Sequence, residues 1–198
     1  MKEETLFLDL DGPMFPDRWI RFASANRRPY PGRMEMPDIV DYWTMDPLSV
    51  EMLNFLYDLH PFRVVLSSSW KKFVSRAQCQ DLFITNGLTL QLIDDEKEWC
   101  TIRLDRNSGL PYSHRSGCSR AAEIREYILR HNVEEYLILD DPMSGSSLDD
   151  KNHELDAERV IMVDPDVGIG SYDYQRMLKV VKKWAGIKPS PTELYGIF

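Results

Sequence analysis

Near its start the sequence contains Leu6-Phe7-Leu8-Asp9-Leu10-Asp11-Gly12, an apolar run that ends in two acids and a glycine. Such a run indicates a buried strand, and ligands bind at the carboxyl ends of strands in open α/β sheets. If the strand continues, its two-residue period turns Asp9 and Asp11 to the same side. Two adjacent carboxylates repel each other unless a cation lies between them, which indicates Mg²⁺ with oxygen ligands. An Asp-Gly turn with solvated acids explains the stretch equally well.

Four further stretches have β-type composition, and segments with helical periodicity separate them. Several of these strands are apolar on both faces, which is typical of a parallel sheet covered by helices on both sides. The predicted strands are residues 5–10, 62–67, 88–93, 136–139 and 159–163. The predicted helices are residues 50–60, residues 120–131 with Asn132 at the C-terminal end, and an apolar stripe of Met177, Leu178, Val181 and Trp184. The sequence predicts an α/β sandwich of three layers with a central, mainly parallel sheet.

The chain has 198 residues, enough for one domain with a single substantial core. We therefore expect residues 1–198 to form one domain. Residues 13–47 separate the first strand from the first helix and are rich in Pro, Met and aromatic side chains, which predicts a small cap-like insert. Gly186, Pro189 and Pro191 prevent the last helix from continuing, so residues 187–198 are expected to be a tail.

Composition excludes several classes of protein. The formal net charge of −8 argues against a generally basic nucleic-acid or membrane binder, so any polyanion must be held by a local patch. Because the sequence shows neither a signal-peptide core nor a membrane span, we expect a cytoplasmic protein that does not bind membranes. The three cysteines are widely spaced and form no Cys-x-x-Cys pair, which argues against a disulfide framework and a zinc site.

Hydroxyl groups follow the second predicted strand. Its apolar residues lead into Ser67, Ser68 and Ser69. Serine hydroxyls can donate hydrogen bonds to phosphate oxygens, although Ser69 is also a suitable N-cap for the next helix. This strand end is therefore a candidate phosphate site.

A second acid pair, Asp140 and Asp141, follows the fourth predicted strand. It can complete a metal site facing Asp9, although an Asp-Pro turn has the same sequence. Upstream, Arg120 lies in the N-terminal turn of a predicted helix, from which it projects either toward the strand ends or into solvent. Along the chain these groups follow the order of an acid pair, a hydroxyl group, a cation and a second acid pair. This order is a much more specific signal than any one of its members.

This order resembles that of the haloacid dehalogenase (HAD) superfamily, whose phosphatases carry Asp-x-Asp after the first strand, Ser or Thr after the second, a Lys or Arg, and a terminal acidic pair. The resemblance covers most of the chain. The chain is most similar to the small HAD domains of RNA-repair and polynucleotide kinase-phosphatase type proteins, in residues 120–141 and 163–168. The resemblance implies a Rossmann-like fold and Mg²⁺-dependent hydrolysis of a phosphomonoester through a phospho-aspartate.

The resemblance also implies a role for each strand-end residue. The catalytic roles are those of the nucleophile Asp9, the general acid and base Asp11, the phosphate-binding Ser67 and the phosphate-neutralising Arg120. Ser68, next to Ser67, is a candidate substrate-binding residue. The implied Mg²⁺ ligands are Asp9, the carbonyl of Asp11, Asp140 and Asp141. Two positions depart from the superfamily pattern, because Pro13 replaces a usual Thr or Val and Arg120 replaces the commoner Lys. Pro13 removes an N–H from the turn, and Arg120 is a forked rather than a point cation.

The insert is locally basic within an acidic protein. Residues 13–37 contain five arginines against two acids, with aromatic side chains between them: Arg18, Arg21, Arg27, Arg28 and Arg33, Asp17 and Glu35, and Trp19, Phe22 and Tyr30. Such a segment can bind a nucleotide or a nucleic-acid end through phosphate contacts and base stacking, with Arg27 and Arg28 as candidate substrate-binding residues. Solvated arginines on a loop explain the same composition.

Three functions therefore stay open. The first is a phosphatase acting on a nucleotide or polynucleotide end, and the second is a phosphatase acting on a small metabolite. The third is a phosphate-binding module without turnover. The presence of acids at all four strand-end positions favours an enzyme, because a module that only binds phosphate has no need of them.

Overall fold

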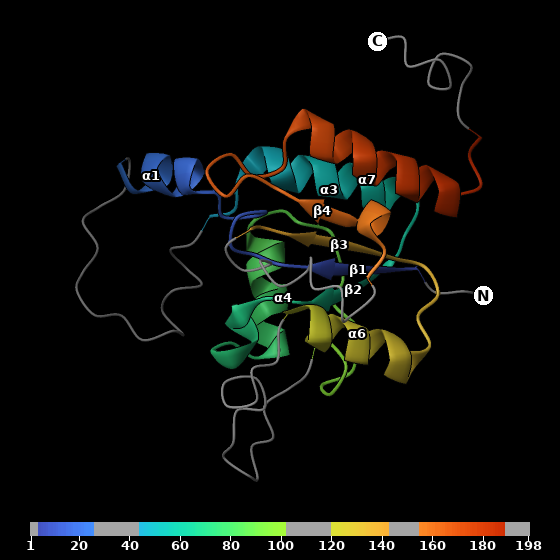
Figure 1. The fold of residues 1–198 in the computed structure, drawn as a ribbon. Helices are drawn as coiled ribbons and strands as arrows, with labels where there is room; N and C mark the ends of the chain where they lie inside the picture. Colours follow the sequence, from blue (N-terminus) through green and yellow to red (C-terminus); the bar gives the residue numbers. More distant parts are fainter. Residues whose placement is uncertain (1–3, 26–43, 102–119, 143–154, 189–198) are drawn as a thin grey trace.

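The computed structural model describes residues 4–25, 44–101, 120–142 and 155–188. Within them, four strands form one parallel sheet in the order β2-β1-β3-β4 (Figure 1). Their bounds are β1 Thr5–Leu8, β2 Arg63–Leu66, β3 Tyr136–Asp140 and β4 Val160–Met162. Leu8 at the end of β1 pairs with Leu66 of β2 and with Leu139 of β3. The carboxyl ends of these three strands therefore meet at one edge of the sheet.

Helices cover both faces of the sheet, which confirms the predicted Rossmann-like α/β sandwich (Figure 1). The α-helices are α1 Asp17–Ala25, α3 Pro47–Leu59, α4 Arg76–Thr85, α6 Arg120–His131 and α7 Ser171–Trp184, and the short 3₁₀ helices are η1 Ser69–Lys72 and η2 Ala157–Arg159. α3 and α7 lie on one face and α6 on the other. Successive residues of β1 point to opposite faces: Leu6 and Leu8 join the cluster that includes α3 and α7, whereas Phe7 packs with Tyr127 of α6. This alternation explains why consecutive residues of the strand, Leu6 to Leu8, are all apolar.

The predicted helices are present, and α3 has shifted ends. α3 begins at Pro47 because Asp46 caps it, with its carboxylate accepting from the Ser49 backbone N–H. α6 has the predicted bounds, and Asn132 after it has a φ of 51°, the left-handed conformation expected at a helix end. Each predicted strand other than residues 88–93 is present within one or two residues of its expected ends.

The strand predicted at residues 88–93 was wrong. The apolar side chains alternate as a strand requires, and Leu88, Leu90 and Leu92 are buried. However, this segment makes only an isolated bridge to β2, between Leu92 and Val64. Side chains take the place of a neighbouring strand: the Gln80 amide donates to the Leu90 carbonyl at 3.1 Å and accepts from the Leu92 N–H at 2.9 Å. Periodicity shows which side chains are buried but not what satisfies the backbone.

Two α-helices were not predicted. α4 begins with a capping box in which Ser75 and Gln78 hydrogen-bond each other's backbone N–H, a pattern that the sequence does contain. α1 lies inside the predicted insert of residues 13–47, and residues 26–43 of that insert lie outside the described part of the chain. Among the described residues, no helix is long and apolar enough to span a membrane.

Candidate active site at the carboxyl ends of the strands

Three strand ends bring their polar residues together. Asp9 directly follows β1, and its backbone N–H donates to the Leu139 carbonyl of β3 at 2.9 Å. Ser67 directly follows β2, and its backbone N–H donates to the Leu8 carbonyl of β1 at 2.8 Å. Asp140 is the last residue of β3. The ladder hydrogen bonds of the sheet therefore fix the backbone of each residue.

Three buried carboxylates form the centre of the site. Asp9, Asp140 and Asp141 each offer one oxygen, and these oxygens all lie within 4.8 Å of one another. Asp9 and Asp140 have the same local geometry, because Oδ1 of each accepts from the next backbone N–H, at 2.8 and 2.9 Å. Oδ2 of each is buried and has no hydrogen-bond partner among the described residues. Buried acceptors without donors are costly, so this arrangement fits a divalent cation with oxygen ligands.

The protonation of Asp140 reflects this crowding. Burial first, and then the negative charge of Asp9, raise the pKa of Asp140 to about 9, and the positive charge of Arg120 opposes them. In the absence of a cation, a proton is thus the simplest way to reduce the repulsion between these carboxylates. A cation that displaces this proton removes the same repulsion.

Arg120 faces the acids and the serine from the first residue of α6. Its Nη2 lies 3.9 Å from Asp9 Oδ2, its Nε lies 3.8 Å from Asp140 Oδ2, and its Nη1 donates to Ser67 Oγ at 3.4 Å. Its side chain is 10% exposed. These distances place a forked cation on the strand-end edge beside a serine hydroxyl, which is a suitable arrangement for phosphate oxygens.

Asp11 reaches the site through a turn rather than along the strand. β1 ends at Leu8, so the two-residue period does not align Asp11 with Asp9. The turn is closed by the N–H groups of Met14 and Phe15, which both donate to the Leu10 carbonyl at 3.0 Å. Neither bond uses the N–H that Pro13 lacks. Gly12 has a φ of 80°, and a Cβ there would lie 2.6 Å from the Asp141 Cβ, so the turn packs directly against the acid cluster.

The Asp11 side chain differs from those of the other acids. It does not belong to the three-carboxylate group found among the described residues, and its Oδ1 accepts from the Trp70 indole Nε1 at 2.9 Å. Burial raises the pKa of Asp11, the Trp70 hydrogen bond lowers it, and the charges of Asp9 and Asp141 raise it further. A carboxyl group with a raised pKa beside the site is suited to proton transfer.

Ser68, rather than Ser69, caps the short helix that follows β2. Its hydroxyl oxygen accepts from the backbone N–H of Trp70 at 3.4 Å, and Ser69 is the first residue of η1. The expectation that Ser69 is the N-cap was therefore wrong. The Ser68 side chain is fully buried. Its contact with a substrate stays a prediction.

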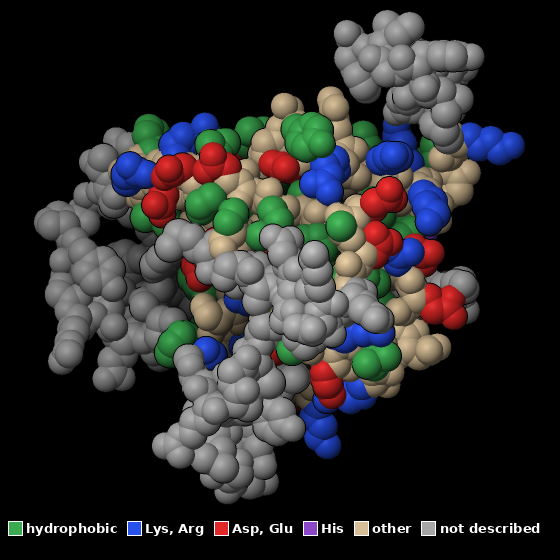
Figure 2. Space-filling view, in the orientation of Figure 1, with side chains coloured by type: hydrophobic (Ala, Val, Ile, Leu, Met, Phe, Trp, Pro, Cys, Tyr) green, Lys and Arg blue, Asp and Glu red, His purple; other side chains and the backbone are tan. Residues whose placement is uncertain are grey.

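The arginines of the insert that the structure describes have partners within the domain. Arg21 Nη2 lies 2.6 Å from Asp166 Oδ1, and Arg18 Nη2 donates to the Val167 carbonyl at 3.4 Å. Figure 2 accordingly shows acidic side chains beside basic ones in the region of α1. These contacts attach α1 to the 164–168 turn. Arg27, Arg28 and Arg33 lie outside the described residues.

A buried ion pair beside the site was not anticipated. Lys71 of η1 contacts the carboxylate of Glu123 in α6, and its Nζ also donates to Thr101 Oγ1 at 2.7 Å. Burial lowers the pKa of Lys71 and the Glu123 charge opposes this shift. The sequence offered no signal for this pair, because Lys71-Lys72 is typical of an exposed helix end and Glu123 of an exposed first turn. Trp70 was likewise not recognised as a partner of Asp11.

The comparison with protein families agrees with this geometry. A family model described as the HAD domain in Swiss Army Knife RNA repair proteins matches residues 5–174. The chain belongs to this family. The matched range of this HAD domain begins at β1 and includes Asp9, Ser67, Arg120 and Asp140. A search of curated proteins found no match. Membership in the family suggests a phosphatase of the HAD type.

Proposed function

We propose that this HAD domain is a Mg²⁺-dependent phosphomonoesterase that forms a phospho-aspartate on Asp9. The observation that carries the proposal is the buried group of Asp9, Asp140 and Asp141, whose oxygens lie within 4.8 Å of one another. Arg120 lies beside two of these acids and donates to Ser67. The arrangement combines a nucleophile, cation ligands and donors for phosphate oxygens at one edge.

The carboxylates of Asp9, Asp140 and Asp141 and the main-chain carbonyl of Asp11 would hold the ion. The two unpartnered oxygens, Oδ2 of Asp9 and Oδ2 of Asp140, support this assignment. When bound, Mg²⁺ supplies positive charge that reduces the repulsion between the carboxylates and the phosphate and stabilises the charge of the transition state.

The residues of the chain perform the remaining steps. The Asp9 carboxylate attacks phosphorus, a bond forms between them, and the ester oxygen leaves with a proton from Asp11. Arg120 and the Ser67 hydroxyl bind the non-bridging oxygens of the phosphoryl group. In the second step, Asp11 accepts a proton from water, and the resulting nucleophile releases phosphate from Asp9. Asp11 is thereby returned to its protonated form.

A phosphorylated nucleic-acid end is the substrate class that the family favours, because the matching model describes RNA-repair proteins. The basic, aromatic composition of the insert supports the same class. Small phosphoesters are the alternative. If the domain binds phosphate without releasing it from any ester, it is a phosphate-binding module instead.

Phosphate release from four groups of compounds tests the proposal: 5′- and 3′-phosphorylated oligonucleotides, nucleotides and sugar phosphates, each with Mg²⁺ and with EDTA. We expect release that requires Mg²⁺ and is poorly supported by Ca²⁺, whose looser coordination displaces the attacking carboxylate. Asp9→Asn should abolish it, whereas Asp81→Asn, which alters an exposed acid of α4, should not. Full activity of Asp9→Asn, or equal rates in EDTA, would contradict the mechanism.

A further inference from the structure

Asp11 is held by an aromatic side chain from a different element. The Trp70 indole Nε1 in η1 donates to Asp11 Oδ1 at 2.9 Å. Asp11 lies in the turn that follows β1, and Trp70 follows β2, which is the neighbouring strand of the sheet. The hydrogen bond therefore joins two strand ends through the side chain to which we assign proton transfer.

The position of the Trp70 ring is itself fixed. The ring stacks on Phe15, with centroids 5.1 Å apart and planes 3° from parallel. Trp70 is 6% exposed and Phe15 is 2% exposed. The Phe15 backbone belongs to the Asp11 turn, since its N–H donates to the Leu10 carbonyl. The backbone N–H of Trp70 donates to the Ser68 hydroxyl. The stack thus fixes both ends of the hydrogen bond.

An indole N–H only donates, so Asp11 Oδ1 must act as the acceptor of this bond. In a protonated carboxyl group the carbonyl oxygen is the stronger acceptor, so an Asp11 that keeps this bond through Oδ1 carries its proton on Oδ2. We propose that Trp70 is a positioning residue, which fixes the Asp11 carboxyl group so that Oδ2 carries the proton delivered to the leaving group. This inference rests on the proposed phosphatase function.

The step balances as follows. A bond forms between an Asp9 oxygen and phosphorus while the bond between phosphorus and the ester oxygen breaks. The ester oxygen takes the proton from Asp11 Oδ2 and leaves as an alcohol or phenol, and Asp11 becomes a carboxylate. Trp70 keeps its proton throughout, because it acts only through Oδ1. A carboxyl group that rotates freely presents the proton in the correct place for only part of the time.

Two esters with different leaving groups separate this role from a purely structural one. Phenolate leaves poorly and needs the proton from Asp11, whereas 4-nitrophenolate is a much better leaving group and needs it less. The parameter to compare is kcat/KM, because it includes only the steps up to phospho-aspartate formation. Hydrolysis of the shared intermediate, which limits kcat for both esters when it is slow, does not enter this comparison.

Trp70→Phe removes the N–H and keeps a ring to stack on Phe15. We expect kcat/KM for phenyl phosphate to fall about tenfold or more, as loss of positioned acid catalysis requires, and kcat/KM for 4-nitrophenyl phosphate to fall less than about threefold. In an Asp11→Asn background, the same substitution should have no further effect on phenyl phosphate, because the two residues act as a unit.

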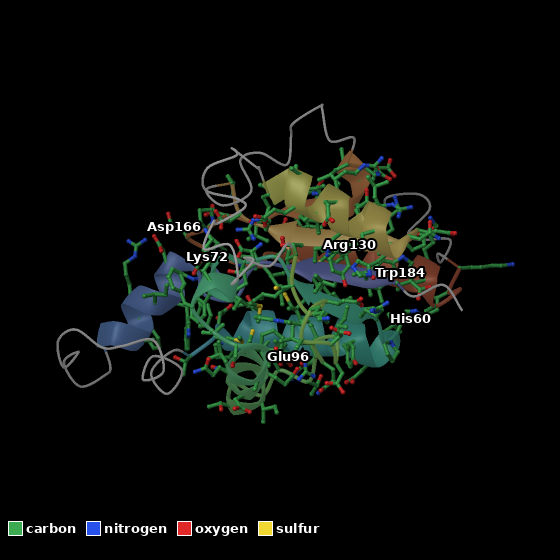
Figure 3. The ribbon with its side chains drawn as sticks, turned by 90° about the horizontal axis from the view of Figure 1, so that it is seen from below. His60, Lys72, Glu96, Arg130, Asp166 and Trp184 are labelled. Carbon is green, nitrogen blue, oxygen red and sulfur yellow. The ribbon has the colours of Figure 1, made fainter. Side chains whose placement is uncertain are left out.

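Trp184→Phe is the matched control. Its indole Nε1 has no hydrogen-bond partner among the described residues, and its ring packs against Phe62, which precedes β2. Figure 3 shows Trp184 beside His60 at one end of the molecule, away from Lys72, the last residue of η1. This control makes the same change of ring size without affecting Asp11, so both rates should stay within about twofold of the wild type.

The outcomes are distinguishable. Equal loss on both esters, no loss on either, or a further loss in the Asp11→Asn background would overturn the role of Trp70 and leave the proposed phosphatase intact. Absence of metal-dependent phosphate release by the wild-type protein from these two esters and from the oligonucleotides, nucleotides and sugar phosphates named above would overturn the proposed function and this inference together. If Trp70→Phe does not fold, benzothienylalanine at this position replaces the indole N–H with sulfur and keeps both rings, and the same comparison applies.

Discussion

Lys71 and Glu123 form an ion pair in the interior, between η1 and the first turn of α6. Their side chains are 7% and 8% exposed, and Glu123 also accepts from the Thr101 hydroxyl at 3.2 Å. Arg120 lies three residues before Glu123 on the same turn of α6. The pair therefore fixes the helix start from which Arg120 reaches the strand ends.

Loss of one partner of this pair should be costly. Glu123→Gln leaves the Lys71 charge buried without a counter-charge, and the expected loss is about 3–5 kcal/mol in the free energy of unfolding. Urea denaturation of the metal-free protein measures it. Glu126→Gln on the same helix is the control, because its ion pair with Arg130 is 44% and 47% exposed and should contribute at most about 0.5 kcal/mol. Equal losses in the two variants would show that the buried pair contributes no more to the free energy of unfolding than the exposed pair.

Proton binding by Asp140 predicts a pH dependence of stability in the metal-free protein. The pKa of Asp140 is about 9 in the fold against an ordinary value of 3.8, so the folded state binds more protons between these values. The contribution of Asp140 to stability should therefore be fully present at about pH 4 and be lost as pH rises toward about 9. Thermal unfolding in EDTA measures this contribution, with Asp140→Asn as the variant that should lack it.

Mg²⁺ should reverse this trend if it replaces the proton. Binding to the folded state alone contributes about 2.7 kcal/mol at a hundredfold excess over Kd. Because Mg²⁺ competes with the proton for Asp140, the stabilisation should grow as pH rises. Asp9→Asn should bind the ion more weakly and show a smaller increase in unfolding temperature. An increase that does not depend on pH, or that Asp9→Asn retains in full, would place Mg²⁺ elsewhere.

The effect of the close approach between Gly12 and Asp141 on stability can be measured separately from the effect of backbone strain. Gly12 and Gly87 have φ values of 80° and 75°, but a Cβ at Gly12 would lie 2.6 Å from the Asp141 Cβ, whereas a Cβ at Gly87 would meet nothing within 4 Å. Gly87→Ala should therefore cost only the strain, about 1–2 kcal/mol. Gly12→Ala should cost more and also weaken Mg²⁺ binding, because Asp141 must move.

Isothermal titration with Mg²⁺ and urea denaturation of both glycine variants measure these effects. Gly87 lies at the end of α4, so its variant should bind Mg²⁺ as the wild type does. If the two variants lose the same stability and bind the ion equally, the close approach at Gly12 has no consequence for the acid cluster.

Several features of the site were predictable from sequence because they depend on strand ends. β1, β2 and β3 are short apolar runs, and in a parallel sheet their carboxyl ends must meet, so Asp9, Ser67 and Asp140 were expected together. The apolar pattern also predicted α6 and hence the position of Arg120. These expectations needed only the period of each element and the direction of the strands.

Other features depend on contacts between side chains distant in sequence. Asp11 is 59 residues from Trp70, and Lys71 is 52 residues from Glu123, so no local pattern indicates either pair. The segment at residues 88–93 failed as a strand for the same reason, because the Gln80 side chain replaces the ladder that periodicity alone would suggest. Local periodicity predicted burial, whereas these hydrogen bonds and ion pairs required the assembled fold.

Arg27 and Arg28 provide the last prediction, on the substrate. They lie outside the described residues, and only the composition of the insert connects them with a polyanion. If they contact phosphates, replacing both with Ala should raise KM for a phosphorylated oligonucleotide and flatten its dependence on salt, because fewer counterions are released on binding. The rate on 4-nitrophenyl phosphate should change little, since this small ester needs only the strand-end residues.

A control with the same loss of charge makes this test specific. Lys179→Ala with Lys183→Ala removes two exposed cations from α7 and should leave the salt dependence of the oligonucleotide reaction unchanged. General damage to the fold would lower the rates on both substrates alike, whereas loss of remote contacts affects only the long one. If the arginine and lysine variants behave alike, the insert does not hold the substrate, and a small phosphoester becomes the preferred substrate of the same catalytic residues.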